Sequence, residues 1–142
     1  MTATPAPDLD DESVSEWPEA LRLELGTHAS NPLVGTRLLL EDERARVWEI
    51  RLAPGERLAF HRHVLDYFWT CVSGGEAISR DGEGRVKRRR YGVAETQALR
   101  FGEGESMIHD LVNAGTEDLV FTTVEFVDSA NRPLPLPPGQ RT

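Results

Sequence analysis

From Leu38 onward, turn residues divide the chain into short segments that are apolar or alternate between apolar and polar residues. Residues 46–52 show the alternation well, because Trp48, Ile50 and Leu52 share one face, as in a half-buried strand. No long amphipathic helix is available to cover a parallel sheet. The pattern therefore predicts an all-β fold of roughly eight to ten short strands, arranged as a sandwich or barrel.

The other predicted strands are rich in β-branched and aromatic residues and end at glycine-containing turns. They cover residues 61–73, 76–79, 85–91, 97–101, 107–112 and 119–127. Residues 81–84, Asp-Gly-Glu-Gly, are expected to form a hairpin loop. Residues 17–27 fit either a turn of helix or a first strand. The prolines in residues 131–142 exclude a helix or central strand, so we expect that segment to run extended along the barrel surface.

Size and charge limit the organisation and the partners of the chain. A length of 142 residues suits one domain, expected over residues 17–142, after a flexible acidic tail at residues 1–16. The formal net charge of −8 disfavours phosphate backbones and anionic lipid surfaces. We therefore expect a small-molecule substrate or ligand, and neither nucleic acid nor a membrane as partner.

Cysteine usage bears on the cellular compartment. Cys71 is the only cysteine, so no disulfide can form within the chain, and a reducing compartment fits. The N-terminal residues lack the basic and apolar regions of a secretory signal, and no apolar run reaches the roughly 20 residues of a membrane span. The sequence thus predicts a cytoplasmic protein.

Three of the four histidines lie in a pattern that suggests a metal site. His61 and His63 are two positions apart in a predicted strand, so both side chains point to the same face. Two imidazoles at this spacing can bind one metal ion at about 2.0–2.1 Å. His109 shares the apolar face of its own segment with Met107 and Leu111, so it can supply a third ligand from another strand. Taken alone, a His-x-His pair is more often two half-exposed histidines near a loop, and the surrounding pattern is what favours a metal site.

The spacing of glycines and histidines resembles two motifs of the cupin superfamily. The first motif is matched by Gly55, by His61 and His63, and by Gly74, or by Gly75 at a longer spacing. The end of the second motif is matched by His109 and Asn113. This resemblance covers residues 55–113 and implies a double-stranded β-helix, or jelly-roll, with the metal inside the barrel. It also implies a homodimer, because cupins of this size usually pair through their sheets.

The departures from the motifs bear on the chemistry. The glutamate of the first motif is replaced by Tyr67, or by Phe68 at the longer spacing. In the second motif, the expected Gly, Pro and Gly are Ala98, Gly104 and Ser106. The expected metal ligands are therefore three histidines and no carboxylate.

Three neutral imidazoles leave the full +2 charge on a divalent ion and leave coordination positions open. Such a site resembles three-histidine cupin dioxygenases, so iron(II) (Fe2+) is the expected functional ion, and zinc, nickel, manganese and copper stay open. This resemblance implies a metal-dependent dioxygenase of a small organic acid or thiol. The alternatives are a non-oxidative isomerase or lyase, and a non-catalytic cupin that binds a metal or small ligand.

Neighbouring residues have less definite roles. Tyr67 shares strand parity with His63, so its hydroxyl can face the metal as a catalytic hydrogen-bond donor, or it can be an ordinary core tyrosine. Asp66 has the opposite parity and is expected to face outward. Cys71 is expected to fill the core. The basic run at residues 87–90 is expected to be a solvated hairpin, and one of its arginines can bind a substrate carboxylate if it reaches the barrel mouth.

Overall fold

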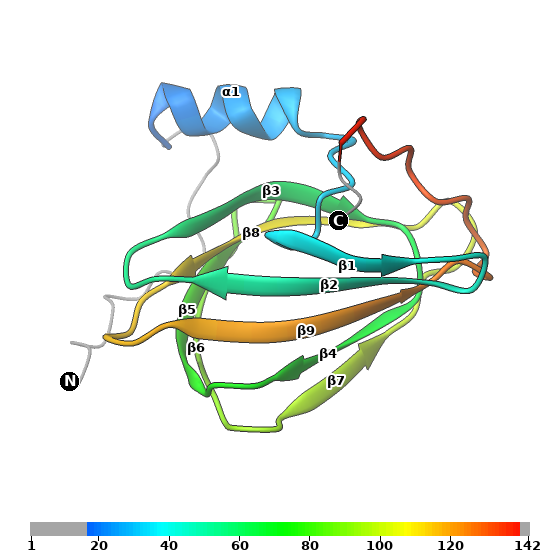
Figure 1. Cartoon of the computed structure of the whole chain (residues 1–142). Helices are drawn as coiled ribbons and strands as arrows, with labels where there is room; N and C mark the ends of the chain where they lie inside the picture. Colours follow the sequence, from blue (N-terminus) through cyan, green and yellow to red (C-terminus); the bar gives the residue numbers. More distant parts are fainter. Residues whose placement is uncertain (1–16, 140–142) are drawn as a thin grey trace.

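The computed structural model describes residues 17–139, so the tail predicted for residues 1–16 lies outside the described residues. Within that range the chain forms one short helix followed by nine strands (Figure 1). In chain order the elements are α1 (Glu19–Thr27), β1 (Arg37–Glu41), β2 (Ala45–Leu52), β3 (Arg57–His63), β4 (Tyr67–Cys71), β5 (Gly75–Arg80), β6 (Val86–Tyr91), β7 (Thr96–Leu99), β8 (Met107–Asn113) and β9 (Leu119–Phe126).

The strands form two antiparallel sheets. The five-stranded sheet has the order β1-β2-β9-β4-β7, and the four-stranded sheet has the order β3-β8-β5-β6. Neighbours in the sheets come from distant parts of the chain, since β9 lies between β2 and β4, and β8 lies between β3 and β5. The all-β prediction is confirmed, and the strand number falls in the expected range.

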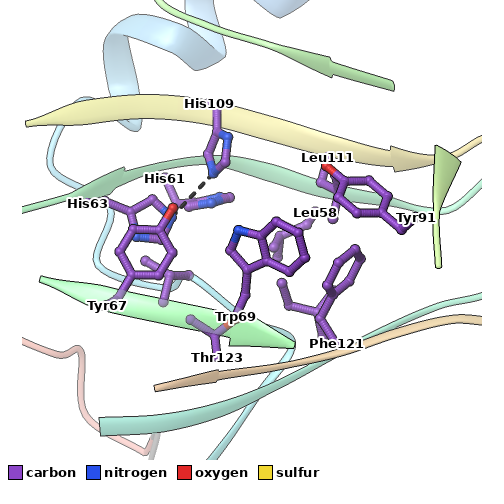
Figure 2. A pocket seen from close by; sticks show the side chains of 12 residues that line it. Leu58, His61, His63, Tyr67, Trp69, Tyr91, His109, Leu111, Phe121 and Thr123 are labelled. Atoms are coloured by element: carbon purple, nitrogen blue, oxygen red, sulfur yellow. Dashed lines mark hydrogen bonds between the residues drawn. The ribbon is translucent and has the colours of Figure 1, made fainter. Parts of the chain in front are cut away.

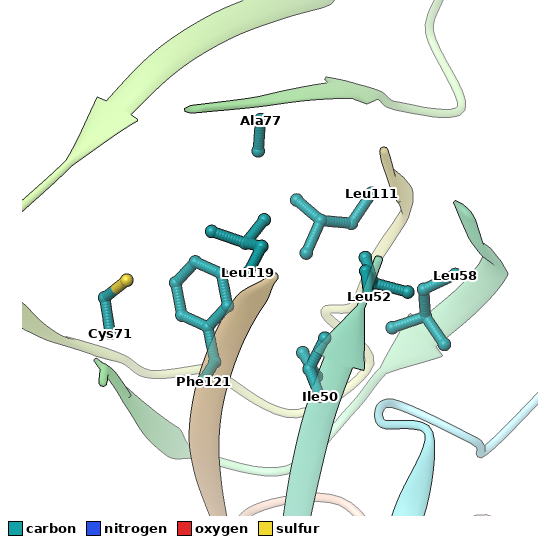
Figure 3. Close-up of a cluster of buried hydrophobic side chains, with 8 residues drawn as sticks. All are labelled: Ile50, Leu52, Leu58, Cys71, Ala77, Leu111, Leu119 and Phe121. Carbon is teal, nitrogen blue, oxygen red and sulfur yellow. The ribbon is translucent and has the colours of Figure 1, made fainter. Parts of the chain in front are cut away.

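The hydrophobic core fills the space between the two sheets. Alternating residues of β2 and β9 supply much of it, as expected from the alternation at residues 46–52. Figure 3 shows one buried cluster, which contains Ile50, Leu52, Leu58, Cys71, Ala77, Leu111, Leu119 and Phe121. The thiol of Cys71 is fully buried, in agreement with its predicted core role.

Residues 17–27, which the sequence left undecided between helix and strand, contain the helix α1. Pro18 immediately precedes the helix, where its fixed φ and missing N–H are tolerated, and Glu19 lies in the first turn. The helix buries no residue of its own, but the Glu24 carboxylate accepts two hydrogen bonds from the Arg57 guanidinium, at 2.6 and 2.8 Å. This ion pair attaches α1 to β3.

The predicted strand at residues 61–73 is wrong in its continuity. It is two strands that belong to different sheets, because the chain leaves β3 at His63 and re-enters at Tyr67. Asp66 lies in the connection, where its Oδ1 accepts a hydrogen bond from the Phe101 N–H at 2.8 Å. The predicted strand at residues 97–101 likewise ends earlier, at Leu99.

Two motif glycines adopt backbone conformations that other residues rarely reach. Gly55 has a φ of 83° in the turn before β3, and Gly74 has a φ of 70° between β4 and β5. An L-residue at such a φ places its Cβ against its own backbone, which costs roughly 1–2 kcal/mol. The spacing of glycines in the first motif therefore marks the turn before β3, which carries His61 and His63, and the turn after β4.

The C-terminal segment follows the surface, as predicted. Residues 131–139 contain no strand or helix, the Leu134 carbonyl accepts a hydrogen bond from Arg46 at 2.9 Å, and Leu136 packs against the cluster around Trp48. None of the helical structure in residues 17–139 has the length and apolar character that a bilayer crossing requires.

Candidate metal centre

A bulge in β3 aims the first two histidines into the barrel. The register between β3 and β8 shifts between Leu58 and His61, so both of these side chains point inward although they are three positions apart. Phe60, between them, turns outward and stacks on Trp17 with ring centroids 5.8 Å apart. Beyond the bulge, His61 is directly opposite His109 on β8.

The three predicted histidines converge at one point inside the barrel (Figure 2). One nitrogen from each ring of His61, His63 and His109 lies within 4.8 Å of the other two. The Nε2 atoms of His63 and His109 are 3.2 Å apart. Two nitrogens at metal-ligand distance from a common ion would be about 2.9 Å apart at a 90° angle and about 3.4 Å apart at a tetrahedral angle. The 3.2 Å between the Nε2 atoms of His63 and His109 lies within this range, so these two rings are spaced to share an ion.

Burial keeps these rings neutral. Desolvation lowers the pKa of His61 to about 3 and that of His109 to about 4. The pKa of His63 is well below its usual value, because of burial and then because of the neighbouring His61 and His109. Neutral imidazole is the form that can bind a metal ion.

The hydrogen bonds of the rings also fit a metal ion. The Nδ1–H of His61 donates to the Ala59 carbonyl at 2.8 Å, which leaves the Nε2 lone pair free to bind a ligand. A proton between His63 and His109 could satisfy their two Nε2 atoms, but it would serve only that pair. The buried Nδ1 of His63 has no hydrogen-bond partner. A cation that accepts one lone pair from each ring would engage all three histidines, whereas a ring-to-ring hydrogen bond engages only His63 and His109.

Tyr67 faces the histidines, although the reasoning from strand parity was wrong. It begins β4 in the other sheet, and its ring stacks on His63 with centroids 4.1 Å apart. Figure 2 shows its hydroxyl pointing toward the histidine cluster. Desolvation raises the pKa of Tyr67, so the hydroxyl keeps its proton and can donate a hydrogen bond.

The histidines form one end of a small cavity with a volume of about 60 Å³. Trp69, Tyr91 and Phe121 form much of its other end, where each ring meets the other two edge to face. Figure 2 shows Tyr91 and Phe121 on the side of Leu58 and Leu111, with Trp69 between them and the histidines. The cavity thus joins a polar nitrogen cluster to an apolar aromatic wall, as in many small-molecule sites.

A wider opening of about 220 Å³ adjoins this cavity, since Tyr67, Trp69, Tyr91 and His109 line both spaces. Its outer rim is formed by Ser79, Lys87, Arg89, Gln97 and Met107. The basic run was expected to be a solvated hairpin, but two of its members stand at this entrance. Lys87 and Arg89 share strand parity with Tyr91, which is the signal that could have placed them there.

A buried ion network behind the histidines was not foreseen. Asp110 follows His109 in β8 and faces the other side of the sheet, where it is fully buried. Its carboxylate accepts hydrogen bonds from the side chains of Arg57 and Arg80, both at 2.8 Å, and from the Arg80 N–H at 2.6 Å. The network ties β3, β8 and β5 together. The sequence does not reveal it, because residue parity predicts only a solvated carboxylate.

Asn113, which ends the second motif, has a structural role. Asn113 is buried, and its side-chain amide donates to the carbonyls of Leu52 and Glu117 at 2.9 and 2.8 Å. Its Oδ1 accepts a hydrogen bond from the Gly115 N–H at 2.8 Å. Asn113 therefore fixes the turn between β8 and β9 and the end of β2, which explains why an asparagine follows the histidine at this spacing.

Comparison with known proteins supports the fold. No protein-family model and no curated protein matches the sequence. Among solved structures, a cupin domain from Bordetella pertussis Tohama I matches with a TM-score of 0.55 and 24% identity, over 63% of this chain and 88% of that one. A protein with a double-stranded β-helix domain from Klebsiella pneumoniae matches with a TM-score of 0.52 and 26% identity, over 66% of this chain and 76% of that one.

Proposed function

Because this chain is a member of the cupin superfamily with a double-stranded β-helix fold, we propose that it is a metal-dependent oxygenase of a small organic anion. The observation that carries the proposal is the convergence of three neutral imidazoles without a carboxylate beside an aromatic cavity. His61, His63 and His109 would hold the ion. A bound iron(II) would supply oxygen activation and Lewis acidity at this point.

The residues of the chain prepare the site in three ways. Burial holds the imidazoles neutral, so that they are ready to bind a cation. The Ala59 carbonyl fixes the orientation of the His61 ring. Trp69, Tyr91 and Phe121 surround the inner chamber with apolar rings, which lowers the local dielectric constant and strengthens electrostatic interactions there.

Tyr67 is the proposed catalytic side chain. Stacking on His63 and burial in the wall leave its ring little freedom, and its hydroxyl points toward the histidines. It would donate a hydrogen bond to a substrate oxygen that gains negative charge during the reaction. Tyr67→Phe removes only this donor, so we expect it to keep the bound metal and to lower turnover by at least tenfold.

Oxygen uptake tests the proposal directly. The purified chain would be loaded anaerobically with iron(II), and oxygen consumption would be followed with a panel of small thiols, hydroxy acids and keto acids. We expect uptake with at least one compound, and its loss in His63→Ala. No oxygen uptake with any compound, from protein shown to hold iron, would contradict an oxygenase.

The same experiment tests the alternative functions. Turnover of a panel compound without oxygen, in protein loaded with zinc, nickel or manganese, would instead indicate an isomerase or lyase. Saturable binding of a panel compound without turnover would indicate a binding protein.

We also propose a homodimer that forms through the outer face of the five-stranded sheet. Directly opposed residues place an apolar row across this face, in the order Leu40, Val47, Val124, Phe68 and Ala98. Exposed apolar rows of this kind are typical of association surfaces.

A cytoplasmic location remains a prediction from the single buried cysteine.

A further inference from the structure

We infer that Lys87 is the substrate-binding cation at the barrel entrance and that it selects small carboxylates. This inference rests on the proposed function, because it assigns a specificity residue to the same cavity. Lys87 is the only lysine in a chain whose other basic residues are all arginines. A lysine ammonium is a compact charge on a flexible stem, which suits an anion that must enter and leave.

The position of Lys87 supports this role. It belongs to β6, the edge strand of the four-stranded sheet, and lies directly opposite Ser79 on β5. Lys87, Ser79 and His109 together line the opening that adjoins the inner chamber, and they also line a second groove beside it. Only β5 separates the strand of Lys87 from the strand of His109.

The spacing between Lys87 and the histidines suits a small molecule. Strand separation and rise place their Cα atoms roughly 12 Å apart. Lys87 and His109 both line the same opening, so a small molecule inside it could contact both residues. An acid of a few carbon atoms could place its carboxylate at Lys87 and its reactive end beside the three imidazoles.

The ion pairs around the entrance leave Lys87 as its available cation. Within residues 17–139, the ammonium group of Lys87 forms no ion pair or hydrogen bond, and neither does the hydroxyl of Ser79. Arg89, by contrast, is paired with Glu95, and its guanidinium lies over the rings of Tyr91 and Trp69, at 4.6 and 5.4 Å from their centroids. Arg89 thus forms part of the wall, and its charge is already neutralised.

The acidic groups of the adjacent groove are also occupied. Asp81 binds the N–H groups of Glu83 and Arg85 at 2.9 and 3.0 Å, and its carboxylate faces the Arg85 side chain at 3.8 Å. Glu83 pairs with the same arginine at 3.5 Å. Lys87, and not an arginine of the basic run at residues 87–90, is therefore the proposed ligand for a substrate carboxylate.

The single lysine makes the test direct. The whole chain would be produced with ¹³C-labelled lysine, which gives one side-chain Cε signal, and titrated with propionate after metal removal with a chelator. Propionamide, which has nearly the same shape without the charge, is the matched probe. We expect a saturable shift of the Lys87 signal with propionate and at least a tenfold weaker response to propionamide. Equal responses to the two probes, or no saturable shift, would overturn the inference.

The indole signal of Trp69 reports whether the anion enters the opening. It should shift with the same midpoint as the Lys87 signal, because Trp69 lines the opening, whereas Trp17 and Trp48 are buried elsewhere. A Lys87 shift without a Trp69 shift would indicate binding at the outer surface only and would contradict the entrance site.

Substitutions distinguish the effect of the charge at Lys87 on propionate binding from the effect of the net charge of the chain. Followed through Trp69, Lys87→Met should weaken propionate binding at least tenfold, and Lys87→Arg should keep it within threefold. Arg90→Met makes the same charge change on the opposite face of β6, where Arg90 pairs with Glu76, and should leave binding unchanged. Equal weakening in Lys87→Met and Arg90→Met would contradict a site at Lys87. Because metal-free protein is used, failure of this test is distinguishable from failure to bind metal, which is measured separately by elemental analysis.

Discussion

The Nε2 atoms of His63 and His109 lie 3.2 Å apart, although 46 positions separate the two residues in the chain. They are brought together by the pairing of β3 with β8, in which His63 is opposite Met107 and His61 is opposite His109. The site is therefore only as rigid as the contact between these two strands. Side chains on the outer face of the same strands hold that contact.

The Asp110 network is expected to stabilise this strand pair. Asp110→Asn keeps the side-chain shape but leaves Arg57 and Arg80 without their shared carboxylate, so we expect a loss of about 3 kcal/mol in the free energy of unfolding. Urea unfolding followed by circular dichroism measures it. Asp118→Asn is the control, because its ion pair with Arg51 is exposed and should contribute less than about 0.5 kcal/mol. Equal stabilities of the two variants would contradict the role of Asp110.

Glu125 is expected to make stability depend on pH. Burial raises its pKa to about 7, against the opposing effects of the Trp48 hydrogen bond and the Arg46 charge. The folded state therefore holds a proton that the unfolded state has released, so Glu125 costs stability as pH rises from about 4.5 to about 7.

Glu125→Gln should remove this cost. Relative to wild type, the variant should gain roughly 3 kcal/mol between pH 4.5 and pH 8. Urea unfolding of both proteins across this range measures the difference, and the shared titrations of other groups cancel. A difference that does not change with pH would show that Glu125 is already ionised in the folded protein.

Two glycines are expected to respond oppositely to alanine. Gly55→Ala should lose roughly 1–2 kcal/mol, because its φ of 83° disfavours a Cβ although nothing lies within 4 Å. Gly26→Ala in α1 also meets no neighbour, and alanine there should gain roughly 0.5–1 kcal/mol through helix propensity. Thermal unfolding of both variants measures these changes, and destabilisation of the same size in both would point to a cause other than backbone conformation.

The proposed dimer surface can be tested with one charge. Phe68→Glu places a carboxylate in the middle of the apolar row and should convert a dimer into a monomer in sedimentation velocity. Val93→Glu introduces the same charge at an exposed residue between β6 and β7, outside that row, and should remain dimeric. A wild-type protein that sediments as a monomer at all concentrations would refute the dimer.

Much of the fold could be predicted from the sequence, because strand alternation and turn glycines are local signals. The alternation around Trp48 and Ile50 correctly predicted one inward face, and the histidine spacing correctly named the three clustered rings. The division of residues 61–73 between two sheets was missed, because a continuous β-rich composition does not show where a chain changes sheets.

The parts of the site that were missed depend on tertiary structure. Asp110 is fully buried against Arg57, which is itself bound by Glu24 of α1. Lys87 reaches the entrance only because β6 is the edge strand next to the opening. Neither relation follows from the local pattern of residues, because both depend on which strands become neighbours.

The metal content of the chain tests the central claim most directly. Protein produced without an affinity tag would be analysed for metals beside His109→Ala, with unfolding curves to show that both are folded. We predict close to one divalent ion per chain in the wild type, and less than a tenth of that in the variant. Equal metal content in the two proteins, or a wild type that binds none of iron, zinc, nickel, manganese and copper when they are supplied, would contradict a metal centre at these three histidines.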